Sequence, residues 1–208
     1  MNQEITQAQR IQLNTIINSC QGYQNPQDFK IALTDGKGIM YNLRNQIARF
    51  SSMSDFYYIT DRAKEHLNNL VTNGQLKFKN GKLLRNSKSQ KLQFTYEHVT
   101  PCCVQLSEII EAVGPNIFQG NKVDRKVFED AILPILLKAN NVVILTKASN
   151  KAKNPLAYSE DKLLVDAGLN SSMPDGWSYN DDDPFERYRV AGLEIPTMTQ
   201  EMYGSFSR

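Results

Sequence analysis

Two short stretches of the chain carry residue types that could hold a metal ion and activate water. The first runs from Leu92 to Pro101 and ends in an acid, a histidine and a proline, with Glu97 and His98 adjacent. The second, 141–153, contains an apolar run between two asparagines and ends in a lysine-rich segment. Carboxylate and amide oxygens suit a hard divalent cation, and a neutral histidine can take a proton from water near neutral pH. This set of residues predicts metal-assisted hydrolysis.

Each stretch has the composition of a β-strand. Residues 92–96 are rich in aromatic and β-branched side chains, and Val142 to Leu145 form a short apolar run bounded by turn residues. We therefore expect the acid and the histidine to lie where the first strand ends, with the second strand as its partner. A histidine after a strand also occurs as a purely structural residue, and Glu-His-x-x-Pro alone is a weak pattern.

The order of these residues resembles a known family. The segment Glu97-His98-Val99-Thr100-Pro101 is similar to the Asp-His-x-x-Pro element of the HNH (His-Me finger, ββα-metal) endonucleases. The segment Asn141 to Lys153 resembles the element that completes their site: an asparagine, an apolar strand, Leu-Thr, a second asparagine and a trailing lysine. Residues 1–90 and 155–208 contribute nothing to the resemblance.

The resemblance implies a role for each matching position. His98 would be the general base that deprotonates the attacking water, and Asn141 would hold the loop that orients it. Glu97 would stand where the family has aspartate, as one ligand of a single Mg²⁺ or Mn²⁺ ion. Asn150, on a helix after the hairpin, would be the second metal ligand. Two lysines would lie near the scissile phosphate, Lys151 and Lys153.

The chain departs from the family pattern in three ways. A helical stretch, 102–139, stands between His98 and Asn141 where members have a short loop. Glutamate in place of aspartate lengthens the metal-binding arm by one methylene group. The zinc-binding cysteine pairs of many members are absent, since the chain has 3 cysteines, two of them adjacent, and no Cys-x-x-Cys. Cys102 and Cys103 leave a thiol nucleophile beside His98 as a further alternative.

A basic hairpin is expected directly before the candidate site. Between Gln75 and Tyr96 every charged residue is a cation, and Asn80-Gly81 is a typical two-residue hairpin turn. Such a block suits a polyanionic partner, although a solvated hairpin is the simpler interpretation. The lysines and arginines expected to contact nucleic acid are Lys77, Lys79, Lys82, Arg85, Lys88, Lys91, Lys147 and Lys151.

Length and composition predict an ordinary globular protein. The 208 residues are 40% hydrophobic and 22% charged, which suits a folded core rather than a disordered chain. No apolar run is long enough for a membrane span and no secretory signal is evident at the first residues, so we expect a cytoplasmic protein without a membrane partner. The three cysteines agree with a reducing compartment.

We expect an α+β fold, mostly helical, with an embedded ββα-metal finger that carries a helical insertion. Three regions are predicted: a helical region 1–74, an HNH-like catalytic region 75–169, and a turn-rich segment 170–208. The catalytic region would contain the basic hairpin 75–91 and the insertion 102–139. Thr60 or Asp61 and Ser159 are predicted to cap helices, and His66 is predicted to be a surface or boundary residue.

The resemblance thus implies a metal-dependent DNA endonuclease, of a restriction or mobile-element (homing) type. RNA remains an alternative substrate, and a homodimer would be the natural way to cut both strands of a duplex. The main alternative is a non-catalytic nucleic-acid- or protein-binding protein that uses the basic hairpin 75–91. A third is a structural or partner-neutralising protein in which Glu97 and His98 only support the fold.

Overall fold

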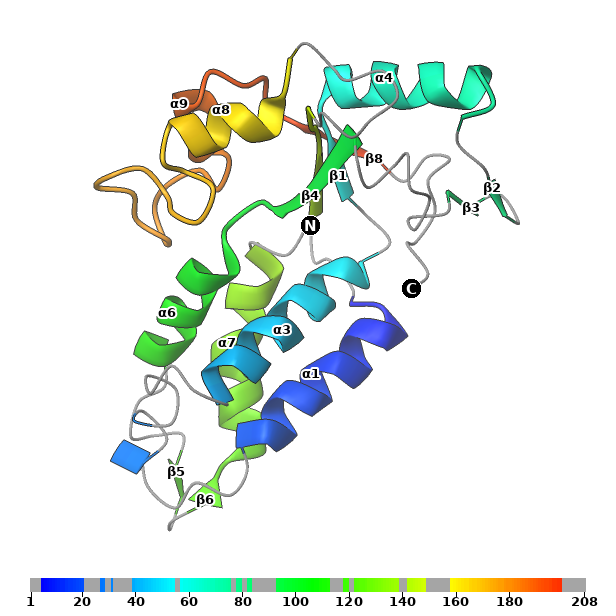
Figure 1. The fold of residues 1–208 in the computed structure, drawn as a ribbon. Helices are drawn as coiled ribbons and strands as arrows, with labels where there is room; N and C mark the ends of the chain where they lie inside the picture. Colours follow the sequence, from blue (N-terminus) through cyan, green and yellow to red (C-terminus); the bar gives the residue numbers. More distant parts are fainter. Residues whose placement is uncertain are drawn as a thin grey trace. The chain divides into compact units, whose positions relative to one another are not determined.

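The structure, a computed structural model, is a mixed α+β protein, as predicted (Figure 1). It describes residues 5–20, 27–28, 31, 39–54, 57–75, 78–79, 82–83, 93–112, 118–119, 122–138, 142–148 and 158–199. The chain divides into two compact units, each made of two separate segments. Unit 1 consists of Met1–Met53 and Cys102–Asn140, and unit 2 of Ser54–Pro101 and Asn141–Arg208.

Unit 1 is built from helices that pack on one another (Figure 1). They are α1 (Gln7–Cys20), α3 (Ile39–Ser52), α6 (Cys102–Ala112) and α7 (Arg125–Lys138). Apolar side chains recur at helical spacing on each and are buried, so each helix turns one apolar face inward. The buried side chains include Leu13, Ile16, Ile17, Leu43, Ile47, Phe50, Leu106, Ile109, Phe128, Ile132 and Leu136. A small antiparallel pair that was not predicted, β5 (Phe118–Gln119) with β6 (Lys122–Val123), lies between α6 and α7 in the chain.

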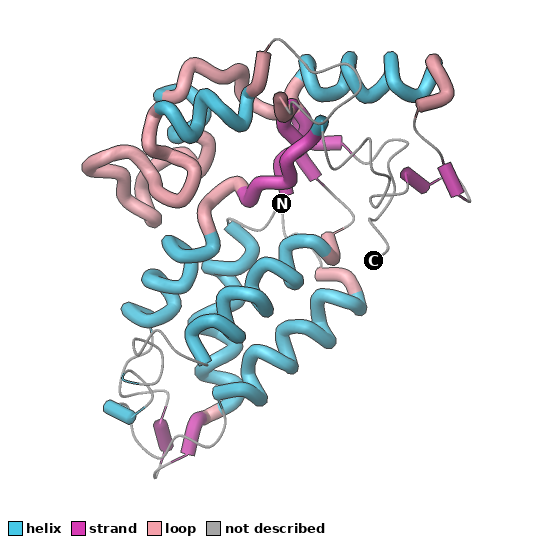
Figure 2. The backbone as a smooth tube through the Cα atoms, in the orientation of Figure 1, coloured by secondary structure: helices cyan, strands magenta, loops and turns pink. Residues whose placement is uncertain are grey.

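Unit 2 is organised around a four-stranded mixed sheet with the strand order β4-β7-β1-β8. Figure 2 draws the strands in magenta. The strands are β1 (Tyr57–Ile59), β4 (Phe94–His98), β7 (Val142–Thr146) and β8 (Thr197–Thr199). Strand β7 runs parallel to β1 and antiparallel to β4, and β8 is antiparallel to β1. Every residue of β7 is buried, because an inner strand covered on both faces meets no solvent.

Helices cover both faces of this sheet. On one face, α4 (Asp61–Thr72) packs Leu67 and Leu70 against Phe94 and Ile144. On the other face, side chains of α8 (Glu160–Asp166) and α9 (Glu186–Val190) join Val143 and Leu145 in a second cluster. Side chains alternate between the faces of a strand, so neighbouring residues of β7 belong to different clusters.

The predicted helix caps are confirmed. Thr60 Oγ1 accepts a hydrogen bond from the Ala63 amide at 3.2 Å, and Ser159 Oγ accepts one from the Lys162 amide at 3.3 Å. Each hydroxyl satisfies an amide that the first turn of a helix leaves without a backbone partner. After α8 the chain turns at Gly168, whose φ of 73° is a left-handed conformation that favours glycine.

The predicted basic hairpin is present as β2 (Phe78–Lys79) paired with β3 (Lys82–Leu83). Strand β8, in contrast, lies in a tail for which no strand was predicted. The two units divide the chain at other positions than the three predicted regions: 54–74 belongs to the unit that contains the sheet, and 102–140 belongs to the unit that contains the N-terminal helices. None of the described helices is long and apolar enough to cross a membrane.

Candidate active site

The pairing of β4 with β7 brings the two predicted stretches together. His98 lies opposite Val142 and Glu97 opposite Val143 in the antiparallel register. The end of β4 is therefore beside the start of β7, directly after position 141. The long stretch between the two strands leaves unit 2 after Pro101 and returns at Asn141, so it does not disturb their pairing. The expected partnership of the two strands is confirmed.

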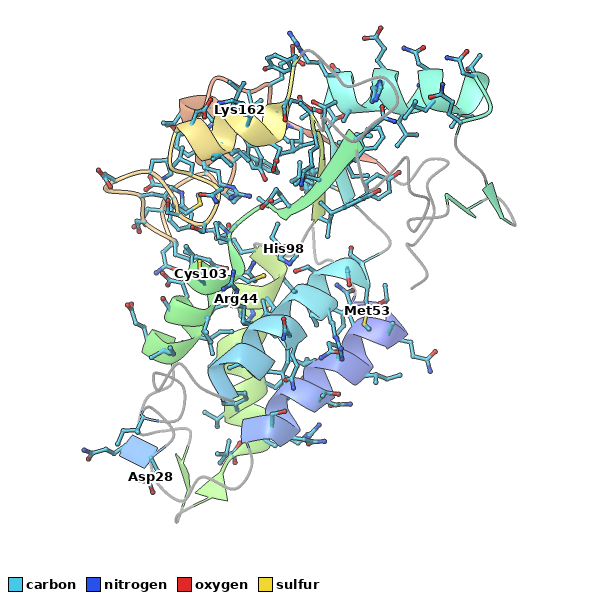
Figure 3. All side chains as sticks on the ribbon, in the orientation of Figure 1. Asp28, Arg44, Met53, His98, Cys103 and Lys162 are labelled. Carbon is cyan, nitrogen blue, oxygen red and sulfur yellow. The ribbon has the colours of Figure 1, made fainter. Side chains whose placement is uncertain are left out.

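Glu97 and His98 point to opposite faces of the sheet, because successive side chains of a strand alternate. Val143, which is opposite Glu97, lies in the cluster with Leu164 and Tyr188. His98 shares its side of β4 with Phe94, which packs on the α4 face. His98 is the last residue of β4 (Figure 3). A bound group could therefore contact both side chains only if it lay at the end of the strand pair.

The carboxyl group of Glu97 lies in a mostly buried place beside an arginine. Its side chain is 27% exposed, and Glu97 Oε2 lies 3.8 Å from Arg187 Nη2. Burial raises the pKa of Glu97 and the charge of Arg187 lowers it, while Asp161 raises it and Lys147 lowers it to smaller extents. The net pKa is raised above the usual value, since burial outweighs the nearby cations.

Arg187, on α9, is completely buried and binds main-chain oxygens of two separate segments. Its Nη1 donates to the Leu169 carbonyl at 3.0 Å, and its Nη2 donates to the His98 carbonyl. Nη2 also donates to the hydroxyl of Tyr188 at 2.9 Å, and that hydroxyl donates to the His98 carbonyl at 3.4 Å. The His98 carbonyl therefore accepts hydrogen bonds from both members of the Arg187–Tyr188 pair.

Tyr188 is as deeply buried as its neighbour. Its side chain has no exposed surface, and burial raises the pKa of its hydroxyl to about 12, so the hydroxyl stays protonated and able to donate. The Arg187 guanidinium carbon lies 4.9 Å from the centroid of the Tyr188 ring. Sequence reasoning missed both residues. The only sequence signal was the prediction of a short amphipathic segment over 184–190, which does not show that an arginine is buried.

A second acid, Glu160, is buried near the other end of β7. Its Oε2 accepts hydrogen bonds from the Thr60 hydroxyl at 2.9 Å, the Thr146 amide at 2.8 Å and the Thr146 hydroxyl at 2.9 Å. These bonds tie the ends of β1 and β7 to the first residue of α8. Because that oxygen is already occupied by three donors, we assign Glu160 to the fold and not to the chemistry.

The other histidine of the chain, His66, has a structural position, in agreement with its prediction as a boundary residue. It is half-buried on α4, and its Nε2 lies 2.8 Å from Oε1 of the buried Gln93. Its ring centroid is 5.3 Å from that of Phe94. His66 thus packs against the start of β4, whereas His98 stands at the end.

Most of the other predicted site residues lie outside the described part of the chain. Lys147 is described: it is half-buried, and its amide donates to the Gln93 carbonyl at 2.8 Å. Lys79 and Lys82 are paired in the β2–β3 hairpin. The predicted residues outside the described ranges are Asn141, Asn150, Lys77, Arg85, Lys88, Lys91, Lys151 and Lys153.

The metal site implied by the resemblance needs only one carboxylate from the described residues. Within those residues no group of three or more His, Cys, Asp and Glu side chains converges as a metal cluster would. Glu97 fits the role of a single oxygen ligand in one respect, because its carboxyl group retains some exposure at the end of a strand. Arg187 opposes that role, since a cation 3.8 Å away repels a second cation.

Comparisons of the chain with protein-family models, with curated proteins and with solved structures found no match. The functional interpretation therefore depends on the residues and geometry described above.

Proposed function

We propose that the chain is a metal-dependent DNA endonuclease in which His98 is the general base. The observation that supports this is the register of the β4–β7 pair, which sets His98 opposite Val142. Two stretches that are far apart in the sequence, one ending in Glu97 and His98 and the other beginning at Val142, thereby meet at one end of one strand pair. An arrangement of this kind is needed for a histidine at a strand end to act together with an asparagine that precedes the partner strand.

The proposed roles follow the chemistry of each group. The imidazole of His98 would take a proton from the attacking water, and Glu97 and Asn150 would supply oxygen ligands to one Mg²⁺ or Mn²⁺ ion. The bound ion would stabilise charge on the leaving oxygen of the phosphodiester. Asn141 would hold the loop that orients His98, as the family resemblance implies. Because Glu97 and His98 face opposite sides of the sheet, the scissile phosphate must lie across the end of the strand pair.

The proposed substrate is DNA, with RNA as the alternative, and the enzyme would be of a restriction or mobile-element type. The cations of 75–91 with Lys147, Lys151 and Lys153 would neutralise backbone phosphates, so binding should weaken as salt rises. A homodimer would place two such sites on the two strands of a duplex. We also propose a cytoplasmic location.

One observation favours a second candidate. The nearest cation described for Glu97 is the buried Arg187, and a buried arginine needs an acid nearby whether or not the protein is an enzyme. In that case the chain would be a non-catalytic binding protein, in which Glu97 and His98 only support the fold and the basic hairpin contacts the partner.

Metal-dependent cleavage separates the two candidates. Wild-type protein and the Glu97→Ala variant would be incubated with supercoiled plasmid in Mg²⁺, in Mn²⁺ and in EDTA. The endonuclease proposal expects nicked or linear DNA with wild type in either metal, none in EDTA, and a large loss in the variant. DNA binding without cutting under every condition would support the binding protein instead.

A further inference from the structure

We propose that Arg187, assisted by Tyr188, is a positioning residue that fixes the end of β4 and so the direction of the His98 side chain. The inference rests on the proposed endonuclease function. It assigns a role in the site to the C-terminal segment that contains α9, a part of the chain in which the family resemblance places nothing.

The hydrogen bonds of Arg187 carry the argument. The guanidinium has no exposed surface, yet it binds the carbonyl of His98 and lies 3.8 Å from the carboxylate of Glu97. These are the two adjacent residues to which the chemistry is assigned. Among the described residues its Nε atom has no hydrogen-bond partner. The Nη2 group of the guanidinium is therefore directed toward the strand end, while Nη1 binds the Leu169 carbonyl and Nε is left unsatisfied.

The location of this contact explains why a clamp is needed. His98 ends β4 and pairs with Val142, the first residue of β7. After His98 the chain leaves the strand pairing and continues through the buried residues Val99 and Thr100 of the same unit, whereas the residue before Val142 lies outside the described residues. Donors to the last carbonyl of a strand limit the movement of the main chain there, and the side chain of the same residue extends from that main chain. Arg187 and Tyr188 both donate to that carbonyl.

The desolvation of a guanidinium is costly, and at position 187 the hydrogen bonds to the Leu169 and His98 carbonyls offset that cost. The presence of an arginine is better explained by what it holds than by packing. Arg187 is fully buried and so cannot touch DNA. Its loss should therefore lower kcat while leaving the KM for DNA unchanged, as expected when orientation alone is disturbed.

The test uses the full chain and two independent readouts. Arg187→Lys keeps the charge but loses the fork, and Tyr188→Phe is a milder variant that removes only the hydroxyl. Arg189→Lys is the matched control, since Arg189 lies on the same helix but is exposed and pairs with Asp183 and Glu186. Protein carrying ¹³C-carbonyl histidine should give two carbonyl signals, because the chain has 2 histidines.

We expect Arg187→Lys to lower kcat by about 100-fold, with a smaller loss in Tyr188→Phe, and neither to change KM. The His98 carbonyl signal should shift in both variants without metal or DNA, while the His66 signal and the Arg189→Lys control stay unchanged. Folded Arg187→Lys or Tyr188→Phe protein with a shifted carbonyl signal but wild-type kcat would overturn the positioning role alone. An unshifted signal would overturn the proposed contact. Wild-type protein that cuts no DNA would instead overturn the proposed function, and this inference with it.

Discussion

Burial and neighbouring charges have opposing effects on the pKa of Glu97. Burial disfavours its charged form, while Arg187 and Lys147 favour it, and burial prevails. A carboxyl group with a raised pKa holds a proton in the folded state that it would release in the unfolded chain. Ionised Glu97 is thus less favourable in the folded state than in the unfolded chain.

This predicts the sign of a pH effect on stability. Between the usual value of 4.5 and its raised pKa, the folded state binds more protons at this position than the unfolded state. The contribution of Glu97 to the free energy of unfolding therefore falls as the pH rises through that window. The side chain in Glu97→Gln cannot ionise, so its free energy of unfolding should not show this decrease. The variant should therefore become more stable relative to wild type as the pH rises.

Urea unfolding at a series of pH values measures the difference between the two proteins. Asp166→Asn is a suitable control, because Asp166 is an exposed residue that pairs with Lys162. If the difference between wild type and Glu97→Gln grew in the opposite direction, Glu97 would be stabilised by Arg187 more than it is penalised by burial.

At the residue scale, only part of the site could be predicted. The Glu-His pair was placed correctly at the end of a strand because aromatic and β-branched residues directly before it favour a strand. Arg187 could not be predicted, since arginine is usually exposed and its burial depends on oxygens contributed by positions 98 and 169. The opposite facing of Glu97 and His98 follows from alternation, but only once the strand is known to include both.

At the scale of elements, Glu160 connects three of them. One oxygen of its buried carboxylate accepts bonds from Thr60 after β1 and from Thr146 at the end of β7, while its main chain begins α8. The two strands are parallel, so their carboxyl ends meet at one edge of the sheet, where a single acid can reach both.

We expect Glu160→Ala to lower the free energy of unfolding by about 3 kcal/mol, because it leaves several buried donors without an acceptor. Asp166→Ala on the same helix removes an exposed pair with Lys162 and should cost about 0.5 kcal/mol or less. Chemical denaturation of both variants tests the contrast. Equal losses would mean that Glu160 is not the joint between β1, β7 and α8.

Elements with local signals were predictable, and elements defined by distant partners were not. The caps were predicted at Thr60 or Asp61 and at Ser159, because a polar side chain before an apolar-periodic segment is a local signal, and the structure places them at Thr60 and Ser159. Strand β8 was missed, since Thr197–Thr199 has three residues and its pairing depends on β1, far away in the chain. The β5–β6 pair has strands as short as those of the predicted β2–β3 hairpin, and it was missed because the Gly120-Asn121 turn signal between its strands was not used.

At the scale of the whole molecule, the chain builds each unit from two separate segments. The two helices predicted within 102–139 are present as α6 and α7, but their partners, α1 and α3, could not be read from the sequence. Arg10 pairs with Glu129 at 2.5 Å, and Arg125 donates to Asn18 at 2.9 Å, so both contacts join the N-terminal helix to α7. The predicted boundary at 74 follows the turn signal Asn73-Gly74, and the structure ends α4 there.

The central claim is that the histidine at the end of β4 performs the chemistry. The most direct measurement compares plasmid cleavage in Mg²⁺ by wild type, His98→Ala and His66→Ala at saturating DNA. His66 is a matched control, because it contacts Gln93 at the opposite end of β4. Loss of a general base should reduce the rate by about 10²–10⁴-fold. We therefore predict that His98→Ala binds DNA but barely cuts it, while His66→Ala cuts at close to the wild-type rate. Equal cutting by folded His98→Ala and wild-type protein would contradict the account.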